Sequence, residues 1–336
     1  MYFNKKQIQD KLWKDWIWQL KNRITTLDEL VELGVPDVRL KDVSGVIRKY
    51  PFAITPYYAS LINFNDQNDP IARMVMPDLV ELDSYNGQIN PLDKGNKVLT
   101  KGLEQKHDYS VILKVSEDCA SKCRFCARKD ASDGFALAKI EIDAASKYLR
   151  QHPKIWDVLL SGGDPLLQSD EKLWYILGNL RDISSVKRIR IGTRVPATLP
   201  YRITDSLLKV LSSYYPAYIQ THFNHPNEFT KDAIDSIRRL VKKGNILQNQ
   251  TVLLNGVNDD PKVMIDLSEK LIQNGIRPYY AFQCAEGRSI SHFRVDNYRG
   301  NKIMSALNRD TLPGDARAIY AALTQYGNLR KGEEIS

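Results

Sequence analysis

The segment YSVILKVSEDCASKCRFCARKD, residues 109–130, joins an apolar run to three closely spaced cysteines. Its first part, YSVILKV (109–115), is rich in β-branched and apolar residues and predicts a buried strand. Cys119, Cys123 and Cys126 follow that run, whereas the fourth cysteine of the chain, Cys284, lies far away in the sequence. The segment therefore predicts a strand whose exit loop carries a cluster of thiols.

The same order of strand and then helix recurs along the chain from about residue 107 onward. Alternation of this kind indicates βα units with a parallel sheet, and six strands favour a curled, partial (β/α)6 barrel of the α/β class. The predicted strands are 109–115, 156–163, 186–194, 217–223, 246–254 and 277–284, and the predicted helices are 135–151, 171–180, 203–213, 227–243 and 261–273.

Polar motifs follow the predicted strands at the same end of the sheet. The cysteines follow the first strand, and the later exits carry SGGDP (161–165), GTRVP (192–196), THFNHPNE (221–228) and FQCAEG (282–287). Ligands of parallel βα sheets gather at the carboxyl ends of the strands. These motifs therefore predict a single active site on one rim.

Three regions are expected along the chain. Residues 1–106 contain apolar residues at helical spacing and a Thr-capped acidic helix start in TTLDELVEL (25–33), so we expect a mostly helical N-terminal extension. Residues 107–290 are expected to form the barrel core. Residues 291–336 are expected to form a C-terminal segment that closes the site.

The composition is that of a globular enzyme. The chain has 336 residues, 43% of them hydrophobic, and a net charge of +8. The basic residues are scattered, which predicts a solvated surface rather than a nucleic-acid interface. No apolar run is long enough for a transmembrane helix, so we expect a cytoplasmic protein that does not bind a membrane.

The cysteine spacing, C-x3-C-x2-C, differs from that of structural zinc sites, which use paired CxxC motifs or histidines. A [4Fe–4S] cluster is usually held by four thiolates. Three thiolates on one loop therefore favour a cluster with one open iron, which is free to bind a substrate or cofactor.

With these motifs in order, the chain resembles the radical S-adenosylmethionine (SAM) superfamily and, within it, the lysine 2,3-aminomutase family. The resemblance covers about residues 50–305 and includes TPYYASLI, DPIARMVMP, LSGGDPLL, THFNHPNE and NQTVLLNGVNDD. It implies that SAM binds the open iron and is cleaved to a radical that abstracts hydrogen from the substrate. An electron donor such as flavodoxin or ferredoxin is implied as a partner.

The resemblance also implies roles for individual residues. The three loop cysteines correspond to cluster ligands, and Arg128 corresponds to the arginine that grips the substrate α-carboxylate, which a guanidinium fork fits well. The residues that correspond to positions at or near SAM are Ser161, Gly162, Gly163, Asp164, Arg194, His222 and Gln250.

The chain departs from the family where pyridoxal 5′-phosphate (PLP) is held. Lys106, His107 and Ser110 stand in place of the family's phosphate-side residues. The Gly-rich segment with the PLP-binding lysine is absent, which leaves Lys331, only six residues from the C-terminal end of the sequence, as the late lysine.

The substrate side of the pattern changes too. Ala285 replaces an aspartate that binds the distal ammonium in the lysine enzymes, and the neighbouring Glu286 is the expected contact for a cationic side chain.

We therefore expect a radical SAM enzyme that acts without PLP on a free, basic amino acid, either plain or hydroxylated, by elimination (dehydration) or epimerisation. The alternative is a PLP-dependent 2,3-aminomutase of altered specificity that uses Lys331. A non-catalytic iron–sulfur or RNA-binding protein of the same fold is a third interpretation, which the intact SGGDP and cysteine motifs oppose. Whether the chain forms a homo-oligomer is left open.

Overall fold

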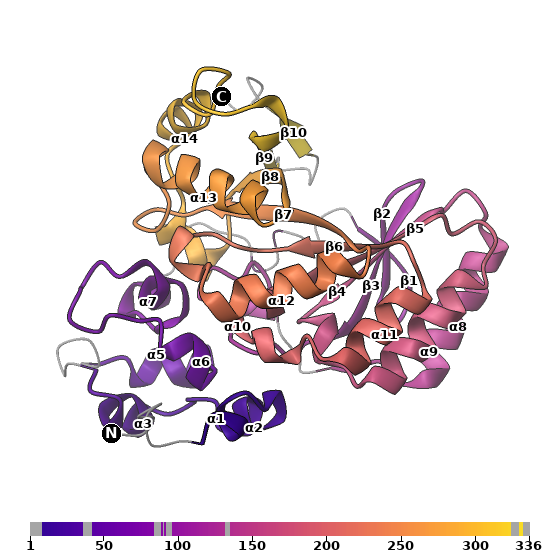
Figure 1. Cartoon of the computed structure of the whole chain (residues 1–336), viewed down its shortest axis with the longest axis horizontal. Helices are drawn as coiled ribbons and strands as arrows, with labels where there is room; N and C mark the ends of the chain where they lie inside the picture. Colours follow the sequence, from indigo (N-terminus) through magenta and orange to yellow (C-terminus); the bar gives the residue numbers. More distant parts are fainter. Residues whose placement is uncertain are drawn as a thin grey trace.

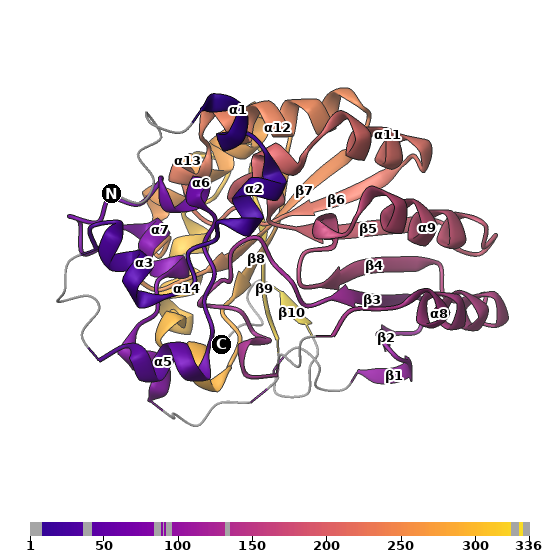
Figure 2. The same cartoon turned by 90° about the horizontal axis from the view of Figure 1, so that it is seen from below.

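The protein is a curled α/β structure built on one ten-stranded sheet (Figures 1 and 2). The computed structural model describes residues 9–35, 42–83, 89, 91, 96–131, 135–323 and 329–331. The strands follow one another in chain order across the sheet. They are β1 (Lys97–Thr100), β2 (Leu103–His107), β3 (Ser110–Ser116), β4 (Asp157–Gly162), β5 (Arg188–Thr193), β6 (Ala217–Thr221), β7 (Ile246–Leu253), β8 (Arg277–Gln283), β9 (Ile319–Leu323) and β10 (Leu329–Lys331).

Strands β3 to β9 are parallel, whereas β1, β2 and β10 add antiparallel pairs at the two edges. The six predicted strands correspond to β3–β8, with ends displaced by at most two residues. The expected (β/α)6 core is therefore confirmed.

The helices that follow the parallel strands pack on the outside of the curved sheet (Figure 2). Four of them begin with a side-chain cap, in which Ser169, Thr204, Thr230 or Asp260 accepts a backbone N–H of the first turn. The helix expected from 227 begins only at 231, because residues 226–228 form a separate 3-10 turn before the Thr230 cap. These helices are α8 (Lys139–Gln151), α9 (Asp170–Arg181), α11 (Asp205–Ser213), α12 (Lys231–Lys242) and α13 (Pro261–Gln273).

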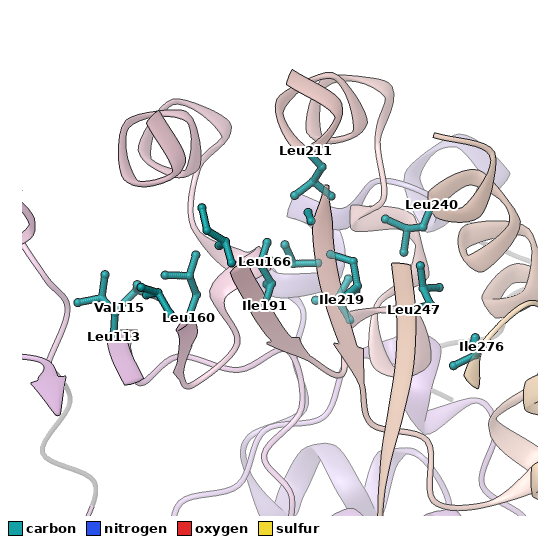
Figure 3. Packing of buried hydrophobic residues seen from close by; sticks show 14 of the residues in the cluster. Leu113, Val115, Leu160, Leu166, Ile191, Leu211, Ile219, Leu240, Leu247 and Ile276 are labelled. Carbon is teal, nitrogen blue, oxygen red and sulfur yellow. The ribbon is translucent and has the colours of Figure 1, made fainter. Parts of the chain in front are cut away.

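The main hydrophobic core lies between the sheet and these outer helices. Ile191 and Ile219 from the strands and Leu211 and Leu240 from the helices meet in this layer (Figure 3). Because side chains alternate along a strand, the residues between the core positions lie on the concave face of the sheet. That face carries polar residues, among them Ser110, Lys114, Asp157, Arg188, Arg190, Gln220, Gln248 and Gln250.

The N-terminal extension contains short helices, which pack on the loops at the carboxyl ends of the strands (Figure 1). Tyr58 and Ile54 are buried there with Phe125 of the cysteine loop and Phe293 in a second hydrophobic cluster. The elements are α1 (Asp10–Trp13), α2 (Trp16–Lys21), α3 (Leu27–Glu32), α5 (Ser44–Lys49), α6 (Pro56–Ala59), α7 (Pro70–Val75) and η1 (Leu79–Leu82). The last residues of the extension form β1 and most of β2.

The end of the chain returns to the sheet. Strand β9 pairs with β8, and β10 pairs with β9, so residues 319–323 and 329–331 extend the sheet on its far edge. The remaining elements are η2 (Lys129–Ala131), η3 (Pro165–Leu167), α10 (Val195–Thr198), η4 (Pro200–Arg202), η5 (Pro226–Glu228), η6 (Arg288–Phe293), α14 (Asn297–Ser305) and η7 (Gly314–Ala316). Among the described residues, no helix has the length and apolar character that crossing a bilayer requires.

Candidate active site

The three cysteines lie on the loop that leaves β3, where the N-terminal extension covers the rim of the sheet. Backbone hydrogen bonds hold this loop: Lys122 N–H donates to the Ala53 carbonyl, and Arg124 N–H donates to the Met74 carbonyl, each at 2.8 Å. The loop backbone is therefore fixed by the extension.

A buried ion cluster holds the same loop from its other side. Arg124 is 1% exposed and forms a two-point ion pair with Glu81 of η1, with Nε 2.9 Å from Oε1. Lys129 donates from Nζ to Glu81 Oε2 at 2.9 Å and to the Ser289 carbonyl at 2.9 Å. The loop is thus tied to both the extension and η6. Nothing in the sequence distinguished these residues from surface charges.

Cys119 and Cys126 lie in an environment that opposes the ionisation of their thiols and raises the pKa of each. Burial, and then the nearby carboxylate of Asp164, raise the pKa of Cys119 well above its usual value. Within the part of the chain that the structure describes, no three His, Cys, Asp or Glu side chains surround a point where one metal ion could bind. A cubane cluster places each thiolate on a different iron, so that observation concerns only mononuclear sites.

Gly162 and Gly163 let the exit loop of β4 press against the segment that leads to Cys119. Gly162 has a φ of 109°, and a Cβ on it would overlap the Ser116 carbonyl oxygen. A Cβ on Gly163 would overlap the carbonyl oxygen of Asp118. The glycines therefore serve close backbone contact with the cysteine loop, in addition to any approach to a ligand.

The hydrogen-bonding capacity of the Asp164 carboxylate is taken up by groups of the protein itself. It accepts hydrogen bonds from Thr193 Oγ1 at 2.7 Å and from the backbone N–H groups of Arg194, Leu166 and Val195 at 2.7–3.2 Å. Asp164 is 5% exposed. It therefore joins the exits of β4 and β5.

Arg194 connects that junction to the cysteines. Its Nη1 donates to Cys123 Sγ at 2.7 Å, and its Nη2 donates to Glu228 Oε1 at 2.7 Å and to the Tyr58 hydroxyl at 3.1 Å. Burial alone would lower the pKa of Arg194, but its interactions with Cys123, Tyr58 and Glu228 together raise it well above its usual value. Arg194 is therefore a fixed cation beside one of the three thiols.

His222 lies on the same rim with a free ring nitrogen. Its Nε2 is buried and has no hydrogen-bond partner among the described residues, and its ring contacts the edge of Phe125 at a centroid distance of 5.7 Å. Burial, and then the charge of Arg194, lower the pKa of His222 to about 3. The imidazole is therefore neutral at physiological pH.

Gln250 lies deeper, on the concave face. Its Nε2 donates to Gln220 Oε1 at 2.7 Å. Ser161 lies at the end of β4, paired in register with Lys114 of β3. The structure thus brings the residues that resemble SAM contacts to the strand ends and the adjoining inner face, around the cysteine loop.

Arg128 follows the last cysteine by two residues, and one of its donors is unused. Its Nη1 is buried without a hydrogen-bond partner in the described part of the chain. Glu286, the expected contact for a cationic side chain, already has a counter-charge, because its Oε1 lies 2.8 Å from Nη1 of Arg294. Ala285 packs in the second hydrophobic cluster with Cys123 and Phe125.

Two of the positions that replace the family's phosphate-side residues, His107 and Ser110, pair in register between β2 and β3. His107 is exposed and stacks on Tyr109 at a centroid distance of 5.7 Å. Ser110 is buried on the concave face and donates to Asp157 Oδ2 at 2.6 Å. The side chain of Lys106 lies outside the described residues.

Lys331, the late lysine of the sequence, belongs to strand β10. Its backbone pairs with Ala321 in β10, and Ala321 pairs in turn with Phe282 of β8. Ala281, the neighbour of Phe282, belongs to the core between sheet and helices. The backbone of Lys331 is thus connected through two ladders to β8.

Comparisons with known proteins agree with this fold and site. A sequence model described as the radical SAM superfamily matches residues 113–267. The chain is 39% identical to an L-lysine 2,3-aminomutase of Clostridium subterminale, over 91% of this chain and 74% of the relative. It is 42% identical to a putative L-lysine 2,3-aminomutase of Aquifex aeolicus, over 98% and 93% of the two chains. A glutamate 2,3-aminomutase of Clostridioides difficile is 36% identical over 88% and 71%.

The barrel, the three-cysteine loop and these matches define a radical SAM enzyme, which uses a [4Fe–4S] cluster and SAM. More narrowly, the chain belongs to the lysine 2,3-aminomutase-like family of that superfamily. The residues present fit both cofactors: three thiols lie on one fixed loop, a cation lies beside Cys123, and a neutral imidazole with an unused nitrogen lies nearby.

Proposed function

We propose that the protein is an amino-acid 2,3-aminomutase, which moves the α-amino group of a free amino acid to the neighbouring carbon. The observation that carries this proposal is the unused, buried donor of Arg128 two residues beyond Cys126. A guanidinium at this point offers a planar fork to an α-carboxylate beside the cluster loop. Relatives that span most of the chain carry the names of lysine and glutamate 2,3-aminomutases.

The roles follow from the arrangement around the rim. Cys119, Cys123 and Cys126 would hold the cluster, and its open iron would take SAM. SAM supplies the radical that abstracts a hydrogen atom from the substrate. Within the chain, His222 and the segment 161–164 would receive SAM, and Arg128 would orient the substrate so that the carbon losing hydrogen faces SAM. A low-potential electron donor such as flavodoxin or ferredoxin would reduce the cluster.

PLP carries the migrating nitrogen in the resembled family, and two observations favour its use here. The backbone of Lys331 belongs to a formed strand, β10, at the edge of the sheet. The concave face also carries Arg190, which donates to Ser110, and Arg188, which lies beside Asp157, at the level where the resemblance expects a phosphate. Lys331 would then bind PLP covalently.

One observation favours the elimination or epimerisation reading. The Ser110 hydroxyl, which replaces a family phosphate contact, is bonded to the carboxylate of Asp157, and a carboxylate repels phosphate. We rank this reading second, because the curated relatives reported above are all aminomutases.

Where the side chain of the substrate is expected, Glu286 forms an ion pair with Arg294, and the two charges cancel. Because Glu286 is neutralised by Arg294, and Ala285 offers no charge, a distal ammonium held as in the lysine enzymes has no unpaired carboxylate at these two positions. L-lysine, L-arginine and L-glutamate are therefore all to be tested.

The experiment is an anaerobic assay of wild type and Lys331→Ala with SAM, reductant and these three amino acids, each with and without PLP. We expect wild type to form a β-amino acid only with PLP, and Lys331→Ala to lose both activity and borohydride-trappable PLP. A PLP-independent wild type that releases a dehydrated or epimerised product would overturn the proposal in favour of the second reading.

A further inference from the structure

A hydrogen-bonded set of polar side chains crosses the concave face near the amino ends of the strands. Arg190 of β5 forms a two-point ion pair with Asp157 of β4, with Nε 2.9 Å from Oδ1. Ser110 of β3 lies between them, donating to Asp157 and accepting from Arg190 Nη2 at 3.1 Å. We call the set of Ser110, Asp157, Arg188 and Arg190 the barrel floor.

Arg188 belongs to the same floor, but its guanidinium lacks a full set of hydrogen-bond partners. Its Nε lies 3.9 Å from Asp157 Oδ1, too far for a hydrogen bond, and this Nε has no hydrogen-bond partner in the described residues. Its Nη2 donates to Gln248 Oε1 at 3.2 Å, and its guanidinium lies 4.6 Å from the centre of the Tyr218 ring. The ring and Gln248 hold the guanidinium in place without cancelling its charge.

The charges of the floor do not balance. Asp157 is 2% exposed and is already paired at both oxygens by Arg190, so two guanidiniums share one carboxylate. The other ion pair of this face, Lys114 with Glu104, is balanced in itself. The floor therefore carries one surplus positive charge among the described side chains, on a residue whose side chain is only 24% exposed.

We propose that Arg188 is an anion-binding residue at the barrel floor, which takes a phosphate monoester or a carboxylate of a bound ligand. A dianionic or monoanionic oxygen group supplies the acceptor that Arg188 Nε lacks and neutralises the surplus charge. Since Arg188 is in β5, the anion contact would come from a different strand than positions 106, 107 and 110, where the resemblance expected it.

This inference rests on the proposed function, because the ligand that enters the barrel is the substrate or PLP. Two sources of the anion fit the chemistry: the phosphate of PLP, or a side-chain carboxylate of the amino acid itself. Comparing PLP with pyridoxal tests the first source. Comparing L-glutamate with L-glutamine tests the second.

The test measures equilibrium binding to the anaerobically purified, cluster-loaded protein. Binding of PLP and pyridoxal is monitored by absorbance, and binding of the two amino acids is measured by calorimetry. Arg188→Gln removes the charge, Arg188→Lys keeps the charge without the fork, and Lys187→Gln is the control. Lys187 is the exposed neighbour, so its variant changes the net charge equally outside the floor. Thermal unfolding and iron content establish that each variant is folded.

We expect Arg188→Gln to weaken PLP binding about 10- to 100-fold, as for loss of a charged hydrogen bond, and pyridoxal binding less than about threefold. Arg188→Lys should be intermediate, and Lys187→Gln should match wild type. If the anion is a carboxylate, Arg188→Gln should instead abolish the preference for L-glutamate over L-glutamine.

The inference would be overturned if Arg188→Gln weakened the binding of PLP and pyridoxal equally, and that of L-glutamate and L-glutamine equally. It would also be overturned if Arg188→Gln and Lys187→Gln changed the affinities by the same amount. The two proposals can fail independently. If wild type makes no β-amino acid, but Arg188→Gln still removes the selectivity for the anionic ligand, only the proposed function is refuted. A working aminomutase whose ligands ignore Arg188 would refute only the anion site.

Discussion

The guanidinium of Arg194 and the thiol of Cys123 are in direct contact, with Nη1 2.7 Å from Sγ. The two residues are 71 positions apart and come from the exits of β5 and β3. Arg194 is held there by Glu228, by Tyr58 and by the His222 carbonyl, which accepts from Nε at 3.1 Å. The cluster loop is thus tied through Arg194 to the exits of three neighbouring strands.

Loss of Arg194 should destabilise the fold strongly. Arg194→Gln leaves Glu228, which is fully buried, without its counter-charge. Removing one member of a buried ion pair costs about 3–5 kcal/mol in the free energy of unfolding. Urea unfolding of the apoprotein measures this loss in the free energy of unfolding. The control is Arg238→Gln, since Arg238 and Asp235 are an exposed pair at 3.9 Å, and it should cost less than about 1 kcal/mol. Similar losses in both variants would contradict the account.

Iron binding should depend on the loop cysteines and not on Cys284. Cys119→Ala, Cys123→Ala and Cys126→Ala should each lose the cluster and the cleavage of SAM to 5′-deoxyadenosine, because a cubane cannot be held by two thiolates on this loop. Cys284→Ala is the matched control: Cys284 is 1% exposed in the second hydrophobic cluster. It should keep about four irons per chain. A cubane retained in Cys119→Ala would refute the ligand assignment.

Arg128 should matter more for the substrate than for SAM. Arg128→Lys keeps the charge but loses the fork, and each charge-assisted hydrogen bond lost costs roughly 1.5–3 kcal/mol of substrate binding. Dissociation constants for substrate and SAM, measured separately, test this. The exposed Arg288→Lys should change neither. Equal weakening of both ligands by Arg128→Lys would remove Arg128 from the substrate role.

The apoprotein should lose stability in mild acid through His292. Burial, and then the charge of Lys129, lower the pKa of His292 from 6.5 to about 4. Between these values the unfolded chain binds a proton that the folded chain does not, so stability falls as pH drops from about 6.5 to 4. The loss should be on the order of 2 kcal/mol.

Urea unfolding of wild type, His292→Asn and His152→Asn across that range isolates the effect. His292→Asn should lower the slope of the pH dependence, to which His222 and His225 also contribute because their pKa values are lowered too. His152 is exposed, and His152→Asn should leave the slope unchanged. An unaltered slope in His292→Asn would show that its proton uptake is not linked to unfolding.

Sequence patterns sufficed for the barrel because its strands alternate strictly with amphipathic helices, as in 156–163 followed by 171–180. They could not show β9 and β10. Residues 319–323 read as an ordinary apolar run, and only the free edge of β8 makes them a strand. The hairpin of β1 and β2 was missed for the same reason, since its pairing with β3 is a tertiary property.

A site can be predicted from sequence where a motif carries its chemistry in neighbouring residues, and the assignment of Cys119, Cys123 and Cys126 as cluster ligands is a prediction of this kind. It cannot be predicted where function depends on distant partners. Glu81 and Arg124 are 43 positions apart, and each alone is an ordinary charged residue. Arg188 likewise differs from neighbouring basic residues only through Asp157, Tyr218 and Gln248, which lie on other strands.

The central claim is that this radical SAM enzyme moves an amino group. Its most direct test is incubation of the reduced, PLP-supplemented enzyme with SAM and an amino acid deuterated at C3 and labelled with 15N at the α-amino group, followed by NMR of the product. We predict a β-amino acid with 15N on C3 and deuterium on C2, because the hydrogen abstracted from C3 is returned to C2 after the amino group has moved. Deuterium transfer accompanied by loss of a side-chain group, or by inversion with 15N still on C2, would contradict the account.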